Sequence, residues 1–275
     1  MIPIKKEHEV AKMREACRIA ANVLDRLCAE VAPGVNTYDL DQEGRKLIES
    51  YGAVSACYDY RVGGRRFPAF TCLSVNDEVV HGIGSLRRVL QPGDVITVDV
   101  CVIHDGWVGD NARTVRVGPV EEDIDFLLVS TEAALYKGIA QAKANKHVGD
   151  ISNTIQRFIE GHNLGIVREF VGHGLGRTMH EEPQVPNFGP KGKGPKLKPG
   201  MTIAIEPMVT LGRPETITLE DGWTAVTRDG RAAAHYEHTV LITDEGPEIL
   251  TIPDWNAEAK EKYDSMQRAL TSSSK

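Results

Sequence analysis

The sequence predicts an α/β fold built from two related halves, and three observations lead to this prediction. Two predicted helices followed by a strand-rich region occur twice along the chain. The segments LQPGDVITVD (90–99) and LKPGMTIAIE (197–206) share the pattern L-x-P-G-x-x-I-x-V/I-D/E, which makes Glu206 the counterpart of Asp99. No low-complexity segment or linker separates the halves. We therefore expect one domain over residues 1–275, with halves of about 1–120 and 121–255.

The first half begins with two predicted helices. Apolar side chains recur at helical spacing over residues 5–31, and this pattern stops at Pro33-Gly34. A second helix follows, with Thr37 as its expected N-cap and Gly52 just beyond its end. The apolar positions of the first helix are Val10, Met13, Cys17, Ala20, Val23, Leu24 and Leu27.

The rest of the chain alternates between strands and helices. Residues 53–120 contain short apolar runs broken by Gly, Pro and Asn-Asp, which is typical of strands. Residues 121–146 return to helical spacing, and Asp150 is the expected N-cap of the next helix. Residues 165–250 are again strand-rich. The polar tail over about 256–275 is expected to be frayed.

Composition excludes several classes of protein. The chain has 275 residues, of which 41% are hydrophobic and 26% are charged, as in ordinary globular proteins. The N-terminus has no apolar segment typical of a signal peptide, and no apolar run is long enough to span a membrane. Five scattered cysteines without a CxxC pair indicate reduced thiols rather than a disulfide framework. We therefore expect a cytoplasmic location and no contact with a membrane.

The net charge of −7 gives no overall signature of nucleic-acid binding. One stretch, KGKGPKLK (191–198), is locally basic and rich in glycine. A solvated loop is the favoured interpretation, and a surface that touches RNA or new chains near the ribosome is the alternative.

The stretch VDVCVIHDGWVGD (98–110) places two aspartates among strand-forming residues. Asp105-Gly106 is a strong signal for a two-residue hairpin turn. If these two residues form the loop, Cys101 faces Asp110 and Asp99 faces residue 112. Side chains alternate along a strand, so Asp99 and Asp110 then lie on one face, diagonal to each other.

Two converging carboxylates need a partner, because burial and mutual repulsion both disfavour their charged forms. A shared proton, a pair of arginines and a metal site are the three alternatives. Glu206 at the end of a strand, Glu237 within AAAHYEHTVLI and His173 within VGHGLGR extend the set to four carboxylates and one imidazole. Taken singly, each acid also fits a turn, a cap or an exposed strand edge. Together they favour two divalent cations of the Co, Mn, Fe or Zn type.

Two more histidines accompany this set. His81 follows NDEVV, and His180 begins the motif HEEP. Each could be a hydrogen-bonded structural histidine. As functional groups, both could donate hydrogen bonds to an oxyanion or to a scissile amide.

Five motifs in order resemble the type I methionine aminopeptidases of the pita-bread metallopeptidases, over roughly residues 3–252. No zinc-binding N-terminal extension precedes them, so the chain is similar to the bacterial short form. The motifs are NDEVVHG (76–82), DV…DGWVGD (99–110), GHGLGR…HEEP (172–183), IEPM (205–208) and YEHTV (236–240).

The resemblance implies an α+β pita-bread (creatinase/aminopeptidase) fold, with a central antiparallel β-sheet and helices outside two pseudo-symmetric halves. By motif, Asp99 would bind one metal, His173 and Glu206 the other, and Asp110 and Glu237 both. A water between the metals would attack the first carbonyl of the substrate, whose free amine would bind the metal beside Asp99.

The resemblance also assigns catalytic and pocket residues. Glu206 would accept the proton of the water, His180 would hydrogen-bond the scissile carbonyl oxygen, and His81 would contact the scissile amide nitrogen. The methionine pocket would contain an aromatic residue of the 58–70 loop, either Tyr60 or Phe67. Its other members would be Cys57, Cys72, Trp223 and, where an aromatic residue is common in the family, Met179. Cys101 is either a small core residue or a neighbour that affects metal preference.

The function implied is the removal of the initiator methionine from new polypeptides when the second residue is small. We expect the enzyme to be a monomer that acts on N-terminal methionine, with the ribosome as a candidate partner and no specific nucleic-acid ligand. The alternatives are a proline-specific aminopeptidase or prolidase, whose extra N-terminal domain has no room before Asp99, and a non-catalytic binding protein, which would lack ligands that are present here.

Overall fold

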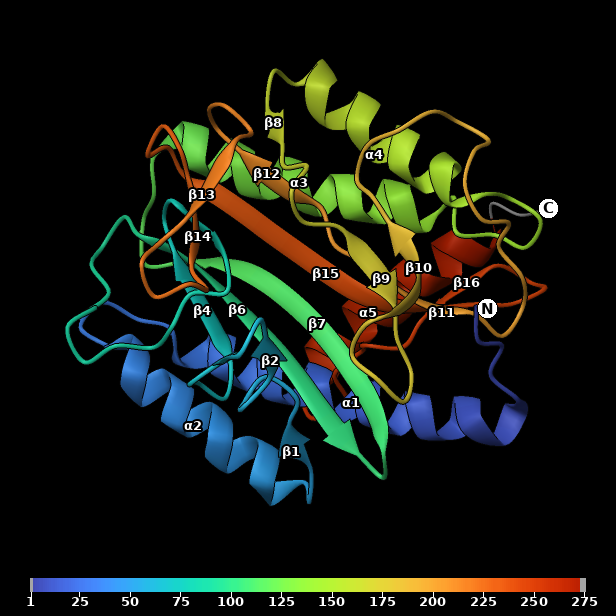
Figure 1. Cartoon of the computed structure of the whole chain (residues 1–275), viewed down its shortest axis with the longest axis horizontal. Helices are drawn as coiled ribbons and strands as arrows, with labels where there is room; N and C mark the ends of the chain where they lie inside the picture. The colour runs from blue at the N-terminus through green and yellow to red at the C-terminus, as the bar shows by residue number, and fades with distance from the viewer. Residues whose placement is uncertain (1, 273–275) are drawn as a thin grey trace.

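The computed structural model describes residues 2–272 and is organised around one large antiparallel sheet (Figure 1). The helices are α1 (Glu7–Glu30), α2 (Thr37–Ser50), α3 (Glu122–Ile139), α4 (Val148–Gly161) and α5 (Ala257–Ser272). The strands of the first half are β1 (Val54–Ser55), β2 (Arg61–Val62), β3 (Arg65–Arg66), β4 (Cys72–Val75), β5 (Glu78–Val80), β6 (Val95–His104) and β7 (Trp107–Arg116). Those of the second half are β8 (Gly165–Ile166), β9 (Gly172–Gly174), β10 (Glu181–Val185), β11 (Thr202–Ile205), β12 (Met208–Thr210), β13 (Thr216–Thr218), β14 (Ala225–Thr227), β15 (Ala233–Ile242) and β16 (Pro247–Ile249).

The large sheet has 11 strands, and its main path runs in the order β1-β6-β7-β15-β11-β9-β10. The pairing of β7 with β15 joins the two halves at the centre. Two smaller sheets, β13-β14-β5 and the hairpin β2-β3, lie beside it. Because one sheet contains strands of both halves, we infer a single domain.

The helices cover the face of the sheet that points away from the aspartates of the predicted hairpin. Gly109 on β7 lies against the backbone of Ala16 in α1, so closely that a Cβ at Gly109 would meet the Ala16 oxygen at 2.3 Å. His238 on β15 contacts Tyr136 of α3. Since neighbouring side chains on a strand point to opposite faces, Asp110 and Glu237 point to the other side.

The predicted repeat is visible in how each half begins. Asn36, just before α2, forms a bridge with Val89, and His147, just before α4, forms one with Lys196. The N–H of Gly34 donates to the carbonyl of Leu90, which begins the first L-x-P-G segment. In the second half, the N–H of Asn145 donates to the carbonyl of Leu197 in the same way. The two halves thus use the same contact to place helix and strand.

Both predicted N-caps are wrong, by one residue for α2 and by three for α4. The N-cap of α2 is Asn36, whose side chain accepts a hydrogen bond from the N–H of Asp39, and Thr37 is the first helical residue. Helix α4 begins at Val148 with His147 as N-cap, and the Asp150 carboxylate accepts a hydrogen bond from the N–H of His147. Asp39 and Asp150 therefore belong to the first turns of α2 and α4, where the positive end of the helix dipole stabilises their negative charge.

Two further predictions are corrected. The helix expected over 121–146 ends at Ile139, because the N–H groups of Gln141 and Ala142 donate to carbonyls three residues back instead of four. Beyond these turns, Asn145 takes a positive φ of 71° and the chain reaches the second L-x-P-G segment. The tail is not frayed over its described part, since Ala257–Ser272 form helix α5. Its Tyr263 is buried edge-on against His238, with ring centroids 5.4 Å apart. Residues 273–275 lie outside the described part.

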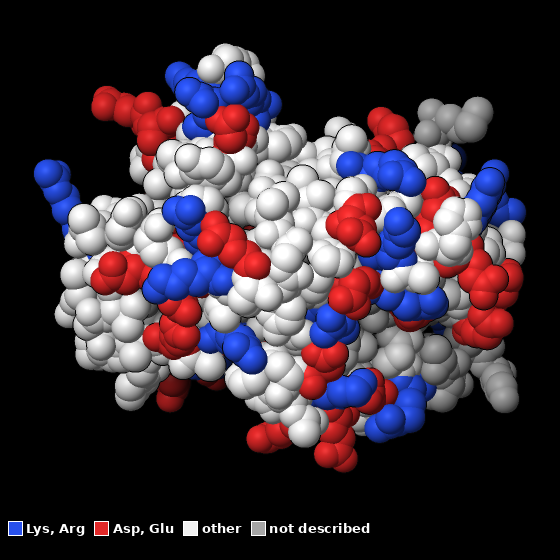
Figure 2. Space-filling view, turned by 90° about the horizontal axis from the view of Figure 1, so that it is seen from below, with Lys and Arg blue, Asp and Glu red and all other residues white. Residues whose placement is uncertain are grey.

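The surface gives no indication of a membrane segment. No helix within residues 2–272 is long and apolar enough to cross a bilayer. On the face seen from below, Lys and Arg side chains alternate with Asp and Glu side chains (Figure 2). That face shows no large patch of a single charge.

Candidate metal centre

The strand register confirms the predicted hairpin. His104 pairs with Trp107 and Cys101 pairs with Asp110, so Asp105 and Gly106 form the loop. Both loop residues have positive φ, 49° and 75°, as the common two-residue hairpin turn requires. Asp99 and Asp110 therefore lie on one face of the sheet.

Glu237 joins the same face through the central strands. Asp99 on β6 pairs with Ala112 on β7, and Ala112 pairs with Glu237 on β15. These three residues form one row across the sheet, and the methyl group of Ala112 leaves space between the two carboxylates. The last pair between β11 and β15 is Ile205 with His238. Glu206 comes directly after Ile205 and therefore lies beside Glu237.

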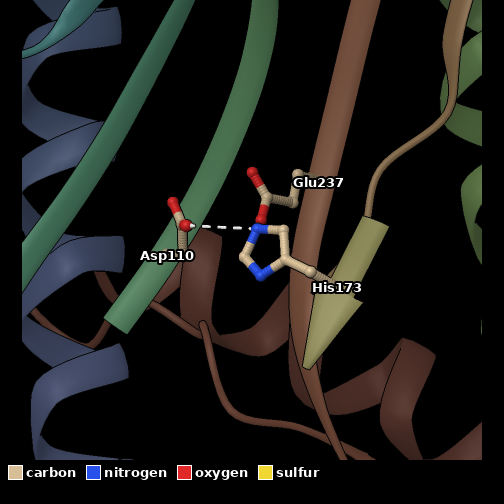
Figure 3. Close-up of side chains that lie close together, drawn as sticks. All are labelled: Asp110, His173 and Glu237. Atoms are coloured by element: carbon tan, nitrogen blue, oxygen red, sulfur yellow. Dashed lines mark ion pairs between the residues drawn. The ribbon is translucent and has the colours of Figure 1, made fainter. Parts of the chain in front are cut away.

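His173 on β9 completes the cluster (Figure 3). Its Nε2 lies 3.9 Å from Oδ2 of Asp110 and 3.5 Å from Oε1 of Glu206. Its Nδ1 is 2.9 Å from the carbonyl of Gly174, to which it donates a hydrogen bond, so the lone pair on Nε2 faces the carboxylates. One donor atom each from Asp110, His173 and Glu237 lie within 4.8 Å of one another.

The electrostatics show that the carboxylates are not balanced by the protein itself. The pKa values of Asp99, Glu206 and Glu237 are raised well above the ordinary values of these groups. Burial is the main cause, and repulsion from neighbouring carboxylates adds to it. Burial raises the pKa of Asp110 to about 7. Within residues 2–272, Oε1 of Glu206 and Oε1 of Glu237 are buried without a hydrogen-bond partner.

The donor set fits divalent cations. The groups within ion-pair distance of these carboxylates are imidazoles, His173 and His235, rather than the arginines considered from the sequence. Burial lowers the pKa of His173 to about 4 and that of His235 to about 3, so both rings are neutral near pH 7. Buried oxygens without partners beside a neutral imidazole are what a cation of the Mn, Fe, Co or Zn type requires.

The carboxylates line a cavity of about 230 Å³. Tyr60 and Phe67 both line it, so the two aromatic candidates of the 58–70 loop are not exclusive alternatives. Phe67 packs edge-on against Trp223, with ring centroids 5.4 Å apart. The other predicted residues that line the cavity are Cys57, Cys72, His81, Asp99, Asp110, His173, Met179, His180, Glu206 and Glu237.

The two predicted donor histidines both line this cavity and have different neighbours. The ring of His180 lies against that of His173, with centroids 4.4 Å apart, and its Nδ1 is 2.7 Å from the hydroxyl of Tyr60. His81 has a positive φ of 61° and packs edge-on against Phe170. Burial lowers the pKa of His180, and it lowers the pKa of His81 to about 4, so both are neutral near pH 7.

Three cysteines also line the cavity. The thiols of Cys57 and Cys72 hydrogen-bond each other, and the thiol of Cys101 hydrogen-bonds the carboxylate of Asp110. Burial raises the pKa of Cys57 and Cys101, and the hydrogen bond with Cys57, followed by burial, raises the pKa of Cys72, so the three thiols stay protonated. Cys101 is therefore a buried residue that also contacts a candidate ligand.

Sequence reasoning missed His235, Phe170, Val62, Val80 and Val171 as cavity residues. His235 precedes Glu237 by two positions on β15, so the alternation of side chains along a strand could have placed it on the same face. No sequence signal identifies the others, which reach the cavity from loops and short strands.

The chain is similar to proteins of known family along most of its length. The model of metallopeptidase family M24 matches residues 11–244. A methionine aminopeptidase of Clostridium acetobutylicum is 46% identical over 252 residues, which cover 92% of this chain and 99% of that protein. The crystal structure of a methionine aminopeptidase from Thermotoga maritima superposes with a TM-score of 0.88 at 41% identity, covering 91% of this chain and 99% of that one. A prolidase from Pyrococcus furiosus shares the fold at a TM-score of 0.72 and 21% identity, with 91% of this chain and 66% of that one covered.

Proposed function

The chain belongs to metallopeptidase family M24 and to the methionine aminopeptidases within it, and from this premise we propose how its site works. It is a metal-dependent hydrolase with the pita-bread fold, and it removes the initiator methionine from polypeptides. We propose that it acts where the second residue is small. The observation that carries this assignment is the match along nearly the whole of the relative's length, together with a buried carboxylate and histidine cluster.

Two divalent ions of the Co, Mn, Fe or Zn type would occupy the cluster. Asp99 would hold one, His173 and Glu206 the other, and Asp110 and Glu237 both. Four carboxylates supply four negative charges, which two such ions balance. Bound there, the ions supply a water that ionises near neutral pH and a positive charge for the substrate's oxygen and amine.

Three side chains would act on the substrate directly. Glu206, a buried carboxylate that lines the cavity, would accept a proton and pass it to the leaving amine. The Tyr60 hydroxyl, if it donates to Nδ1 of His180, leaves the ring hydrogen on Nε2, where it can donate to the scissile carbonyl oxygen. His81, which also lines the cavity, would contact the scissile amide nitrogen.

The walls of the cavity would select methionine. Phe67, Trp223 and Met179 present apolar surfaces, and Cys57 and Cys72 present neutral thiols. An unbranched thioether fits irregular apolar space and makes favourable contacts with aromatic rings.

The remaining proposals concern the cellular setting. We propose a cytoplasmic monomer, consistent with reduced cysteines and with the lack of a membrane-spanning helix in the described residues. Contact with the ribosome through the basic segment 191–198 stays a prediction. Cleavage of Xaa-Pro peptides is not favoured, because the likeness to prolidase at 21% identity concerns the fold alone.

The test is a product scan over the first two residues of short peptides. Purified protein with Mn(II), Fe(II) or Co(II) should release methionine from Met-Ala-Ser, and a chelator should abolish the release. Met-Leu-Ser, with a large second residue, is the matched control and should be a poor substrate. Cleavage of Xaa-Pro peptides without cleavage of Met-Ala-Ser would overturn the assignment.

A further inference from the structure

We propose that His235 is a positioning residue for Glu206: its imidazole N–H holds one carboxylate oxygen of Glu206 while the other is directed at the metals. The inference deepens the proposed function and rests on it, because Glu206 is there both a metal ligand and a proton acceptor. No motif used to recognise the family includes His235.

The geometry places one imidazole at each oxygen of Glu206. Nε2 of His173 lies 3.5 Å from Oε1, and Nε2 of His235 lies 3.9 Å from Oε2. The two histidines come from different strands, β9 and β15. His173 is the candidate metal ligand of the pair, so Oε1 is the oxygen on the metal side and Oε2 is the one that His235 can hold.

His235 is available for this role because its ring has no other partner. The residue is 2% exposed, and neither Nδ1 nor Nε2 has a hydrogen-bond partner within residues 2–272. A buried polar group without a partner costs about 1–3 kcal/mol, so a site that retains one needs a compensating interaction. The ring lines the cavity, where Glu206 is the carboxylate within its reach.

The backbone of His235 is held in place. Its N–H donates to Oγ1 of Thr114 at 2.8 Å, and the same hydroxyl donates to its carbonyl at 2.9 Å. The strand therefore fixes the Cα, and a change in side-chain torsion is enough to close the gap of about 1 Å to a charge-assisted hydrogen bond. That bond would leave Glu206 a single orientation toward the metals.

Outer partners of this kind matter for metal binding. Removing the hydrogen-bond partner of a metal-ligating carboxylate typically lowers metal affinity or activity by about 10–100-fold. In this chain the hydrogen-bond donor to Glu206 would be the imidazole of His235. The side-chain amide of a glutamine has a similar length and could donate the same hydrogen bond. His235→Gln is therefore the conservative variant, and His235→Leu removes the donor while keeping an apolar group in the space.

The experiment is a titration of the metal-free protein with Mn(II), followed by the electron paramagnetic resonance signal of the free ion. We expect His235→Leu to weaken the binding of one ion by 10–100-fold and His235→Gln to stay within about threefold of the parent. With the metals saturating, kcat for Met-Ala-Ser should fall in His235→Leu with KM little changed. His162→Leu, which removes a partly buried imidazole at the end of α4, is the matched control and should bind Mn(II) as the parent does.

Unfolding of the metal-free proteins separates this role from a structural one. His235→Leu removes an unpartnered polar group, so its metal-free form should be as stable as the parent or more stable. Unchanged Mn(II) affinity in His235→Leu would overturn the proposal, and so would an equal loss in His235→Gln, which would indicate packing instead. A parent protein that binds Mn(II) and releases no methionine would overturn the proposed function, while the ratio of affinities would still decide the role of His235.

Discussion

Replacing Asp110 by Asn should stabilise the metal-free protein and abolish its response to metal. In the absence of metal, Asp110 is a buried carboxylate surrounded by other carboxylates. An amide of the same shape carries no charge and can still accept the hydrogen bonds that Cys101 and the N–H of Asn111 give to the carboxylate. The variant therefore removes repulsion and desolvation cost without emptying the space.

The magnitude follows from the pKa of Asp110, which burial raises from 3.8 to about 7. Because the folded value lies above the unfolded one, the ionised group costs stability at pH values above about 7 and costs nothing below about 4. At about 1.4 kcal/mol for each unit of pKa, the cost at pH 8 is at most about 4 kcal/mol. The gain from Asp110→Asn should be largest at pH 8 and should disappear as the pH falls toward 4.

Urea unfolding with a chelator at pH 8 and at pH 4.5 measures this gain. Adding Mn(II) at 100 times its dissociation constant should then stabilise the parent by about 2.7 kcal/mol and leave Asp110→Asn unchanged. Asp105→Asn, the same chemical change at the exposed hairpin turn, is the matched control and should have almost no effect. If Asp110→Asn destabilised the metal-free protein at pH 8, the picture of an unbalanced carboxylate cluster would be wrong.

Three further variants test the fold and the pocket. Gly109→Ala should cost at least about 3 kcal/mol in the free energy of unfolding, because the new Cβ meets the backbone of α1 at 2.3 Å. Gly161→Ala, where nothing lies within 4 Å, should not destabilise, and equal effects in the two variants would refute the close packing of α1 on β7. Tyr60→Phe should lower kcat for Met-Ala-Ser about tenfold with little change in KM, because His180 loses the hydrogen-bond partner that fixes the orientation of its ring. An unchanged kcat would show that the His180 ring needs no such partner. Trp223→Ala should lower the ratio of kcat/KM for Met-Ala-Ser to kcat/KM for Ala-Ala-Ser by roughly 10–200-fold. An unchanged ratio would exclude Trp223 from the pocket.

The hairpin shows how far local sequence can determine a site. An Asp-Gly pair with positive φ at both residues fixes the turn, and the turn fixes every pair along β6 and β7. The shared face of Asp99 and Asp110 could therefore be predicted from the sequence. The L-x-P-G repeat likewise predicted that Asp99 and Glu206 occupy equivalent places in the two halves.

Other features depend on long-range contacts that local patterns do not reveal. The helix expected over 121–146 ends at Ile139, and Asn145 beyond it donates a hydrogen bond to the carbonyl of Leu197, more than fifty residues away. The tail forms a helix whose Tyr263 is buried against His238, although its composition is polar. His235 was missed because its nearness to Glu206 follows from the arrangement of β15 beside β11, which the sequence does not state.

The most direct test of the metal centre is an anomalous-difference map from crystals grown with Mn(II). We predict two peaks, both in contact with Asp110 and Glu237, one of them also touching Asp99 and the other His173 and Glu206. A map without peaks at these side chains, in crystals of protein that releases methionine from Met-Ala-Ser, would contradict the proposed centre.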